Sequence, residues 1–540
     1  MVTGLGFEEH LLGANFDQVK GTAPLFLTYI RRFREVEQFY SWDPSKEWSH
    51  HIENLQARQY PRAELADILF RQMQAFGFTR AAEQRAALLA RRDTMVVITG
   101  QQVGLFGGPL YTLYKALTAI RLSRYLEERY KKPFLPIFWM VSEDHDLAEV
   151  DQAWIIDKNG ELVGLRWQGG EGLQGLPACG IKLKEEIKGL IARLDESLHP
   201  TEFKGEILAH LQEAYGSGES FATAFARWIY WLLGDYGLIV VDPSDPALKR
   251  LAGPVFVKEI KEPAAPLAAT AGRRLRENGY SPQMEVDEYS PGLFFLAPER
   301  VRVVRDQEQF RLGRRGLLPQ QLEKVAQEQP ELLSPNVLLT PILQSFLFPA
   351  VACVTGPAEV CYLAQLKEVF AHFALPMPVV FPRQSLTLLE RRTARFLKEE
   401  GISLGQLLKE DKSWALQAMP KALADLLQNI KGEREEKFGR LKELVENWDK
   451  SLAPNVLAAR NAAAYHLSIL EKKLIASQKK KEGTFLNRLT VARNRAFPKR
   501  QLQERVLNFI PYLVRYGRGF TNGLLAELDL FSWEHRVHVL

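Results

Sequence analysis

An acidic cluster with one histidine provides the residues best suited to acid–base chemistry in this sequence. Four carboxylates and an imidazole fall within the eight residues that begin at Ser142: Glu143, Asp144, His145, Asp146 and Glu149. Acidic residues behind a serine also suit the first turn of a helix, where they oppose the helix dipole. At the end of a core strand, such a cluster can hold Mg²⁺ with a nucleotide, orient a ribose or bind a substrate amine. Zinc is not expected, because His145 is the only soft ligand nearby.

A glycine-rich loop is the second candidate for chemistry. Four glycines lie between Gly100 and Pro109, where a helix is expected to begin. Glycine lets backbone amides approach a ligand, and a helix start carries partial positive charge, so the loop suits phosphate or carboxylate. The spacing matches neither a dinucleotide fingerprint nor a P-loop, and a tight turn that needs glycine geometry is the alternative. The candidate nucleotide-binding residues here are Gly100, Gln101, Gln102, Gly107, Gly108, Tyr111 and Lys115.

Three further stretches follow strand candidates and supply polar side chains. Asp242 follows the run 238–241 and either binds substrate or only caps a helix. A second helix start after a strand offers Thr355, Gly356, Glu359, Tyr362 and Gln365 as substrate-binding candidates. Arg383 follows the last strand. It either binds a phosphate of the nucleotide, or a carboxylate, in bidentate fashion, or it only caps the sheet. Cys353 and Cys361 flank apolar runs without a nearby histidine, so we expect them to be buried and not nucleophilic.

Five short apolar runs predict the strands that position these residues. They cover residues 95–98, 134–141, 238–241, 351–354 and 379–381, and they alternate with helical patterns. This order predicts an α/β fold with a doubly wound, Rossmann-like parallel sheet. The turns at Gly108-Pro109 and Gly356-Pro357 resemble one another and would lie at the carboxyl edge of the sheet, where such sheets bind ligands. We therefore expect the active site at that edge.

Changes in residue composition and hydrophobic periodicity along the chain predict its domain organisation. Residues 1–90 read as a helical segment that packs on the body, and residues 91–384 as a nucleotide-binding body with helical or mixed insertions at about 151–235 and 250–345. Apolar residues at alternating 3 and 4 steps predict an antiparallel helical coiled-coil hairpin over 385–500, with its turn at 452–455. Its seam is imperfect, so a partner chain or the body would complete it. Residues 501–540 are expected to return to the body.

Composition bounds the class of protein. The 540 residues are 46% hydrophobic and 25% charged, which is typical of a globular, multi-domain protein. The net charge of +5 is small, and the densest basic stretch, from Lys479 to Arg500, reads as a solvated helix face, so nucleic acid is an unlikely partner. Three cysteines without metal-binding spacing fit a reducing cytoplasm. No signal peptide or membrane span is predicted.

Taken together, several long stretches resemble the BshC family, the bacillithiol biosynthesis cysteine-adding enzymes. They are TGQQVGLFGGPLYTLYKALTAIRL (99–122), PIFWMVSEDHDLAEV (136–150), SPNVLLTPILQ (334–344), TGPAEVCYLAQLKEVF (355–370) and MPVVFPRQS (377–385). The resemblance implies a Rossmann-like body and a coiled-coil domain that forms a homodimer. It also implies a ligase that joins the carboxyl of cysteine to the amine of glucosaminyl malate, with ATP as co-substrate and Mg²⁺ on its phosphates.

The resemblance also implies roles for the candidate residues. The glycine loop with Tyr111 and Lys115 would face the nucleotide, the acidic cluster would face the nucleotide or the substrate amine, and the segment 355–362 with Arg383 would complete the pocket. The sequence departs from the family pattern at Thr340, where that pattern carries arginine, and this bears on the identity of the acceptor. The HIGH and KMSKS signatures of class I synthetases are absent. Two alternatives remain: a nucleotidyl-transferring enzyme for another small amine or acid, and a non-catalytic coiled-coil scaffold.

Overall fold

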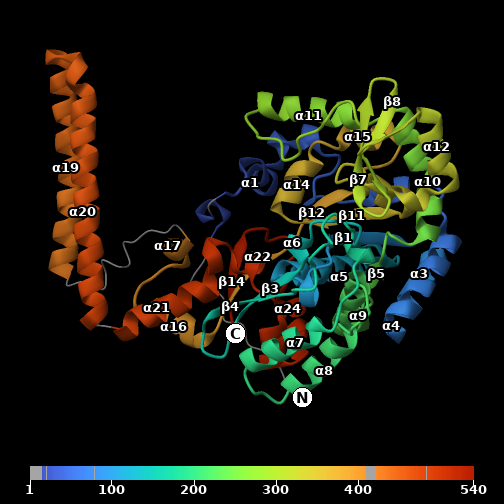
Figure 1. The fold of residues 1–540 in the computed structure, drawn as a ribbon, viewed down its shortest axis with the longest axis horizontal. Helices are drawn as coiled ribbons and strands as arrows, with labels where there is room; N and C mark the ends of the chain where they lie inside the picture. Colours follow the sequence, from blue (N-terminus) through green and yellow to red (C-terminus); the bar gives the residue numbers. More distant parts are fainter. Residues whose placement is uncertain (1–14, 20, 78, 409–420, 482) are drawn as a thin grey trace.

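The body of the molecule is built on one parallel sheet. The computed structural model describes residues 15–19, 21–77, 79–408, 421–481 and 483–540 (Figure 1). Five strands pair in the order β12-β11-β1-β2-β5, and every pairing is parallel. Their bounds are β1 Met95–Gln102, β2 Phe134–Val141, β5 Ile239–Val241, β11 Ala350–Thr355 and β12 Val379–Pro382. The predicted Rossmann-like sheet is thus confirmed, with each strand at an apolar run that the sequence marks.

The strand order fixes where a ligand can enter. The chain runs from β1 outward through β2 to β5 and then returns to β11 and β12 on the other side of β1. The connections therefore reverse direction between β1 and β11, which is the topological switch point where open α/β sheets bind ligands. Helix α5 (Leu110–Tyr130) follows β1 at this point, and its N-terminus lies at the carboxyl edge of the sheet.

Two insertions cover the carboxyl edge. The first carries α6 (Leu147–Val150), the hairpin β3 (Gln152–Ile156) and β4 (Leu162–Arg166), and helices α7 (Glu186–Ser197), α8 (Lys204–Ala214) and α9 (Phe221–Leu233). The second carries α10 (Pro246–Lys261), α11 (Ala265–Glu277), α12 (Pro319–Glu328) and an antiparallel sheet. The order of that sheet is β10 (Leu333–Pro335), β6 (Leu293–Leu296), β7 (Arg300–Asp306), β8 (Gln309–Leu312) and β9 (Arg315–Leu317). Helix α13 (Thr340–Leu347) then leads back to β11.

A buried carboxyl group in the second insertion predicts a pH dependence of stability. Glu259 of α10 is fully buried and accepts hydrogen bonds from the amides of Gly292 at 2.8 Å and Ala264 at 3.2 Å. Burial raises the pKa of Glu259 to about 7, against the opposing effect of the two amides. At pH values between the pKa of Glu259 in the unfolded chain and about 7, the folded protein binds one proton more than the unfolded chain at this carboxyl group. The resulting contribution to the free energy of unfolding is complete below the unfolded pKa and is lost as pH rises through about 7.

We therefore expect the stability of the wild type to decline over this range relative to a Glu259→Gln variant. Urea denaturation of both proteins at a series of pH values measures the difference. Parallel pH profiles would show that Glu259 ionises as it does in the unfolded chain.

The N-terminal segment lies against the outer strands of the sheet. Its helices are α1 (Pro24–Arg31), α2 (Ser49–Gln56), α3 (Arg62–Phe76) and α4 (Arg80–Ala87). Two buried tyrosines tie it to the body, because Tyr29 Oη donates to the carbonyl of Val380 at 2.5 Å and Tyr40 Oη to that of Val360 at 2.9 Å. These contacts span more than three hundred residues of sequence and fix the position of β12 and the helix after β11.

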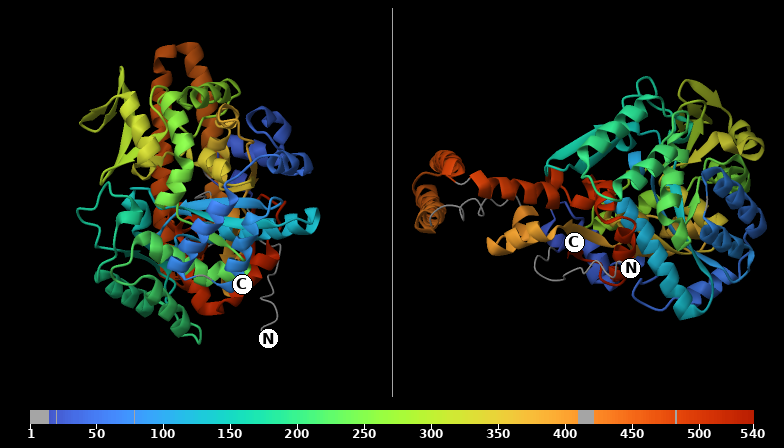
Figure 2. Two further views of the ribbon diagram at one scale, coloured as in Figure 1. Left: turned by 90° about the vertical axis from the view of Figure 1, so that its right-hand side faces the viewer. Right: turned by 90° about the horizontal axis from the view of Figure 1, so that it is seen from below.

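A long helical arm projects from the body, as Figures 1 and 2 show. Its base contains α16 (Arg391–Glu399), α17 (Leu404–Leu408) and α21 (Gly483–Ala496), and its shaft is the antiparallel pair α19 (Lys421–Trp448) and α20 (Ala453–Lys481). The predicted turn at 452–455 is wrong, because the turn begins two residues earlier and ends three residues earlier. The turn is the 3₁₀ segment Lys450–Leu452, and Pro454 instead occupies the first turn of α20, where proline needs no donor. No helix in the described part of the chain is long and apolar enough to cross a membrane.

The C-terminal segment returns to the body, as the sequence predicts, through α22 (Gln503–Val506), α23 (Ile510–Tyr516) and α24 (Gly519–Glu527). Its last strand, β14 (His535–Val539), pairs in parallel with β13 (Ser385–Leu389). The sequence places 385–389 in the helical hairpin, and this assignment is wrong. The five residues of β13 are all buried, so a strand pairing from the far end of the chain overrides their helical context.

Candidate active site

A cavity of about 390 Å³ opens at the carboxyl ends of β1 and β2. The glycine loop and the start of α5 form one wall, the segment from α6 to β3 forms a second, and the chain between α21 and α23 crosses over the top. We call this last segment, residues 499–508, the crossover. The lining residues are Gln102, Gly104, Gly108, Pro109, Tyr111, Glu149, Gln152, Ala153, Trp154, Lys499, Gln501, Arg505, Val506 and Asn508. The volume suits a small polar metabolite.

The crossover holds the glycine loop in place. Asn508 Nδ2 donates to the carbonyls of Phe106 at 3.0 Å and Gly108 at 2.8 Å, and the amide of Leu110 donates to the carbonyl of Leu507 at 2.8 Å. The amide of Gly107 donates to the carbonyl of Gly104 and to Tyr215 Oη. These loop amides are therefore already paired within the protein. A phosphate bound to them would have to displace these contacts.

Two glycines of the loop are required by its geometry. Gly107 and Gly108 have φ angles of +90° and +76°, which side chains rarely adopt. A Cβ atom at Gly107 would also lie 2.5 Å from the ring of Phe509. The glycine pattern thus serves a tight turn under the crossover, and the polar side chains Gln102 and Tyr111 line the cavity beside it.

Lys115 lies at the switch point, but its charge is paired. Its ammonium donates to the carbonyl of Gly100 at 2.8 Å and to Gln101 Oε1 at 2.9 Å, and it lies 2.5 Å from the carboxylate of Glu359. Glu359 in turn accepts from the amide of Gly356 at 2.7 Å. The two strand-to-helix turns predicted to meet at this edge do meet there. They are joined by an ion pair in which the lysine is nearly buried.

The acidic cluster divides into a buried and an accessible part. Glu143 is buried, with Lys249 Nζ at 2.7 Å and Ser334 Oγ at 3.0 Å. Lys249 is buried as well and also donates to the carbonyl of Leu333. Glu143 therefore joins the end of β2 to α10 and to the antiparallel sheet, and this contact positions the residues that follow it in sequence.

The accessible part consists of Asp144, His145 and Glu149. Gln102 Nε2 donates to Asp144 Oδ2 at 2.6 Å and to Glu149 Oε2 at 2.5 Å, so one amide holds both carboxylates beside the cavity. Arg300 contacts Asp144 at 3.5 Å and the Nδ1 atom of His145 at 3.4 Å. Asp146 is exposed at the start of α6. Asp144 and His145 are thus partly exposed groups next to the cavity residues Gln102 and Glu149 in the hydrogen-bond network or in sequence.

Arg383 is buried and pairs with a carboxylate of the chain itself. Its guanidinium donates to Glu504 Oε1 at 2.7 Å and lies near the ring of Tyr111. Glu504 also accepts from Ser385 Oγ at 2.9 Å and from the amide of Leu386 at 3.0 Å. Burial opposes the charge of Arg383, but Glu504 outweighs it and the pKa of Arg383 is raised. Arg383 thus anchors the crossover to the end of β12 through Glu504.

Other predicted site residues do not line this cavity. Asp242 accepts from Ser142 Oγ at 2.6 Å and from Ser244, which fixes the loop after β5 against the acidic cluster. Gln365 is buried and hydrogen-bonds the backbone of Met284 and Ala268. Substrate binding by Asp242, Thr355, Gly356, Glu359, Tyr362 and Gln365 stays a prediction.

The cavity residues that are absent from the sequence-based candidates include Trp154, Lys499, Arg505 and Asn508. Lys499 belongs to the basic stretch that reads as a solvated helix face. It instead has a φ of +51°, outside a helix, with its ammonium 3.3 Å from the ring centroid of Trp154. No local pattern shows that the crossover returns over a loop 400 residues earlier. The positive charges of Lys499 and Arg505 are the sequence signal that could have pointed to this segment.

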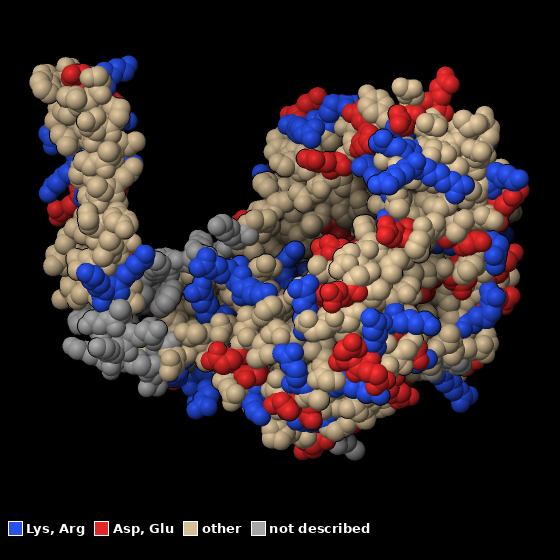
Figure 3. Space-filling view, viewed as in Figure 1, with Lys and Arg blue, Asp and Glu red and all other residues tan. Residues whose placement is uncertain are grey.

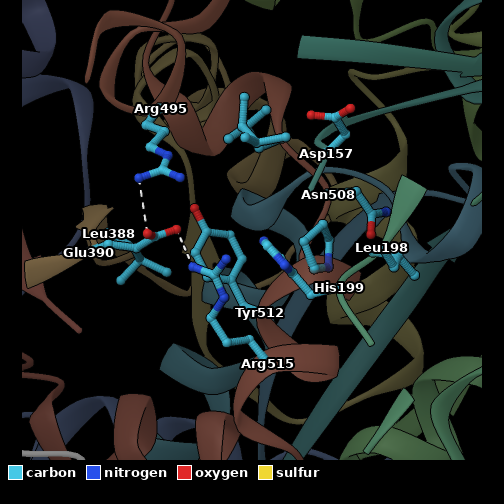
Figure 4. Close-up of a pocket in the computed structure, with 12 residues that line it drawn as sticks. Asp157, Leu198, His199, Leu388, Glu390, Arg495, Asn508, Tyr512 and Arg515 are labelled. Atoms are coloured by element: carbon cyan, nitrogen blue, oxygen red, sulfur yellow. Dashed lines mark hydrogen bonds and ion pairs between the residues drawn. The ribbon is translucent and has the colours of Figure 1, made fainter. Parts of the chain in front are cut away.

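A second, smaller cavity of about 40 Å³ lies on the other side of Asn508 (Figure 4). There the carboxylate of Glu390 lies between the guanidinium groups of Arg495 and Arg515, with His199 beside Tyr512. Glu390 begins the arm, Arg495 belongs to its last helix, and Arg515 belongs to the returning helix α23. This cluster therefore fastens the base of the arm to the body.

We expect a Glu390→Gln substitution to lower stability by about 1 kcal/mol, because the three groups are partly exposed and solvent screens their attraction. Hydrogen exchange of α21 should rise more than that of β1. Equal exchange in both elements would show that the cluster does not hold the arm.

Comparisons with known proteins cover almost the whole chain. The model for the N-terminal Rossmann-like domain of bacillithiol biosynthesis BshC matches residues 15–384, and that for its C-terminal coiled-coil domain matches residues 386–540. The "Putative cysteine ligase BshC" of Salinibacter ruber is 31% identical over 527 residues, with 95% of each chain covered. The protein of that name from Chloroherpeton thalassium is 32% identical over 528 residues, with 92% of each chain covered.

Proposed function

Because this chain belongs to the BshC family of bacillithiol biosynthesis, we propose that it is a ligase that joins L-cysteine to the amine of glucosaminyl malate. The observation that carries this proposal is that Glu149 lines a cavity of metabolite size and that Asp144, which precedes His145, is bound to the same Gln102 amide. Carboxylates and an imidazole in such a place can bind an amine and accept its proton. The names of the relatives support the ligase class.

Amide formation requires an activated carboxyl group, and ATP is the proposed co-substrate. Transfer of an adenylyl or phosphoryl group to the cysteine carboxylate forms a mixed anhydride and releases pyrophosphate or ADP. The amine then attacks the acyl carbon, the carbon–oxygen bond to AMP or phosphate breaks, and the amine loses a proton. The chain must therefore hold the amine close to the acyl carbon and accept one proton.

The residues at the cavity divide these tasks. Asp144 and His145 are the proposed proton acceptors, because both are accessible and both are held by Arg300. Glu149 lines the cavity and is the proposed partner of the protonated amine before it reacts. Glu143 acts as a positioning residue through Lys249 and Ser334.

Mg²⁺ fits this arrangement only as an ion that enters with the nucleotide. Among the described residues there is no group of three or more His, Cys, Asp or Glu side chains that could hold a metal ion. Mg²⁺ bound to phosphates keeps several waters and needs only one or two protein carboxylates. Asp146, which is exposed at the start of α6 and has no part in binding the amine, would supply one such carboxylate.

The test is incubation of the protein with cysteine, glucosaminyl malate, ATP and Mg²⁺, followed by thiol labelling and separation of thiols and nucleotides. A new thiol with the mass of the amide, formed only with ATP, supports the proposal. The nucleotide released, AMP or ADP, identifies the anhydride. Consumption of ATP with cysteine but without the amide would favour transfer to another acceptor, and no turnover at all would favour a scaffold.

We further propose that the enzyme is a homodimer joined through the arm. Large apolar side chains are exposed along the shaft at Leu426, Ile430, Leu441, Leu444, Trp448 and Tyr465. Figure 3 shows the shaft standing free of the body, with few charged residues on much of the visible face. An apolar surface of this kind on a projecting hairpin favours association. Light scattering should give twice the chain mass for the wild type and a single chain mass for a Leu444→Lys, Trp448→Lys variant; equal masses contradict the proposal.

A further inference from the structure

Two cations on the crossover lack a carboxylate partner. Lys499 and Arg505 both line the active-site cavity and both are exposed. Neither forms an ion pair with any described residue, and the Lys499 ammonium lies over the ring of Trp154, 3.3 Å from its centroid. The other cations around the site are paired: Lys115 with Glu359 at 2.5 Å, Lys249 with Glu143 at 2.7 Å and Arg383 with Glu504 at 2.7 Å. Among these described cations of the site, the ones without a carboxylate partner are thus the two on the crossover.

The backbone that carries these two cations is held rigidly. Gln503 is buried and donates to the carbonyls of Leu388 at 2.8 Å and Arg495 at 2.6 Å. Glu504 and Asn508 are buried as well, in the contacts with Arg383 and the glycine loop described above. These contacts hold the backbone on both sides of Arg505, and the ring of Trp154 orders the ammonium of Lys499. An ordered backbone and a positioned ammonium lower the entropy lost when an anion binds.

The wall formed by the segment from α6 to β3 contributes carboxylates to the same cavity. Glu149 lines it and has Gln102 as its hydrogen-bond partner, and Asp144 shares the same amide. The cavity therefore presents two cations together with the carboxylate of Glu149. A ligand that matches these charges carries negative groups as well as an amine.

We propose that Lys499 and Arg505 determine acceptor specificity by binding the two carboxylates of the malate half, while the sugar amine faces Glu149 and Asp144. This inference rests on the proposed function for the identity of the acceptor. A nucleotide triphosphate is the other possible source of negative charge. The carboxylate of Glu149 would repel a triphosphate in this cavity. The amides of the glycine loop, which could otherwise donate to phosphate oxygens, already donate to acceptors within the protein.

The test compares two acceptors with two variants. Glucosaminyl malate carries the dicarboxylate, whereas methyl glucosaminide carries the same amine without it. Loss of one charge-assisted contact in Arg505→Gln or Lys499→Met should lower kcat/KM for glucosaminyl malate about 30-fold, mainly through KM. The same variants should leave kcat/KM for methyl glucosaminide unchanged within about twofold. Arg500→Gln, one residue from Lys499 and outside the cavity lining, is the matched control and should resemble the wild type with both acceptors.

Other outcomes overturn the inference. Equal losses with both acceptors would mean that the two cations only support the fold of the crossover. A raised KM for ATP with an unchanged KM for glucosaminyl malate would assign the cations to the triphosphate. If the wild type makes no amide at all, calorimetric titration with glucosaminyl malate still decides the matter. Binding that Arg505→Gln abolishes would leave the specificity role standing while the ligase proposal fails, and no binding would remove both.

Discussion

Replacing Glu504 with glutamine should lower the free energy of unfolding by about 3–5 kcal/mol, because the change leaves the buried charge of Arg383 without a counterion. The side chains of both residues are almost completely buried, and burial alone would lower the pKa of Arg383. Glutamine also weakens the contacts that Glu504 makes with Ser385 and the amide of Leu386. The crossover should therefore loosen along with β13.

Two further variants show whether the lost charge is the cause. In an Arg383→Met, Glu504→Met double variant no unpaired charge remains, so the loss should be smaller than in Glu504→Gln alone. Glu433→Gln removes an exposed ion pair with Lys437 on the arm and should cost less than about 1 kcal/mol. Urea denaturation followed by tryptophan fluorescence measures all three. If Glu504→Gln lowers the free energy of unfolding by less than Glu433→Gln does, the prediction fails, and water must reach the guanidinium of Arg383.

The second large effect is on turnover. Replacing Asp144 with asparagine should lower kcat about 10²- to 10⁴-fold, the usual loss when a positioned proton acceptor is removed. The substitution keeps the shape of the side chain, and the amide of His145 can still donate to the retained oxygen. Stability should change little, since Asp144 is partly exposed and its contact with Arg300 is long.

Single-turnover measurements with preformed acyl donor separate proton transfer from activation. Asp235→Asn, an exposed residue paired with Arg518 far from the cavity, is the matched control and should keep wild-type turnover. If Asp144→Asn retains more than a tenth of the wild-type rate, His145 becomes the remaining candidate for the proton acceptor.

The sequence was sufficient to predict the central sheet because its signals are local. Each parallel strand is buried on both faces and therefore reads as an unbroken apolar run such as 95–98 or 134–141. Proline and glycine at Gly108-Pro109 mark a strand-to-helix turn for equally local reasons. The same holds for the long helices of the arm, whose 3-and-4 spacing lies within single elements. The small antiparallel sheet of the second insertion was not predicted. Its strands are short and several of their residues face solvent, so they do not form apolar runs in the sequence.

The candidate site was predicted only in part. The acidic cluster and the glycine loop do lie at one edge of the sheet, since parallel strands end together. Sequence could not show which charges remain available, because charge pairing is decided by residues far apart in the chain. Lys115 is paired with Glu359, Glu143 with Lys249 and Arg383 with Glu504, and each pair joins different elements.

The sequence by itself determined the strands of the parallel sheet, the long helices of the arm and the edge of the sheet at which chemistry can occur. Only the tertiary structure decided that the crossover lies over the glycine loop and that Lys499 and Arg505 carry the unpaired charge of the cavity. The physical reason is that periodicity and turn preferences act over a few residues, whereas burial and ion pairing depend on which distant segments pack together. Asn508 and Gly108 are 400 residues apart in sequence, and the hydrogen bond between them arises only from that packing.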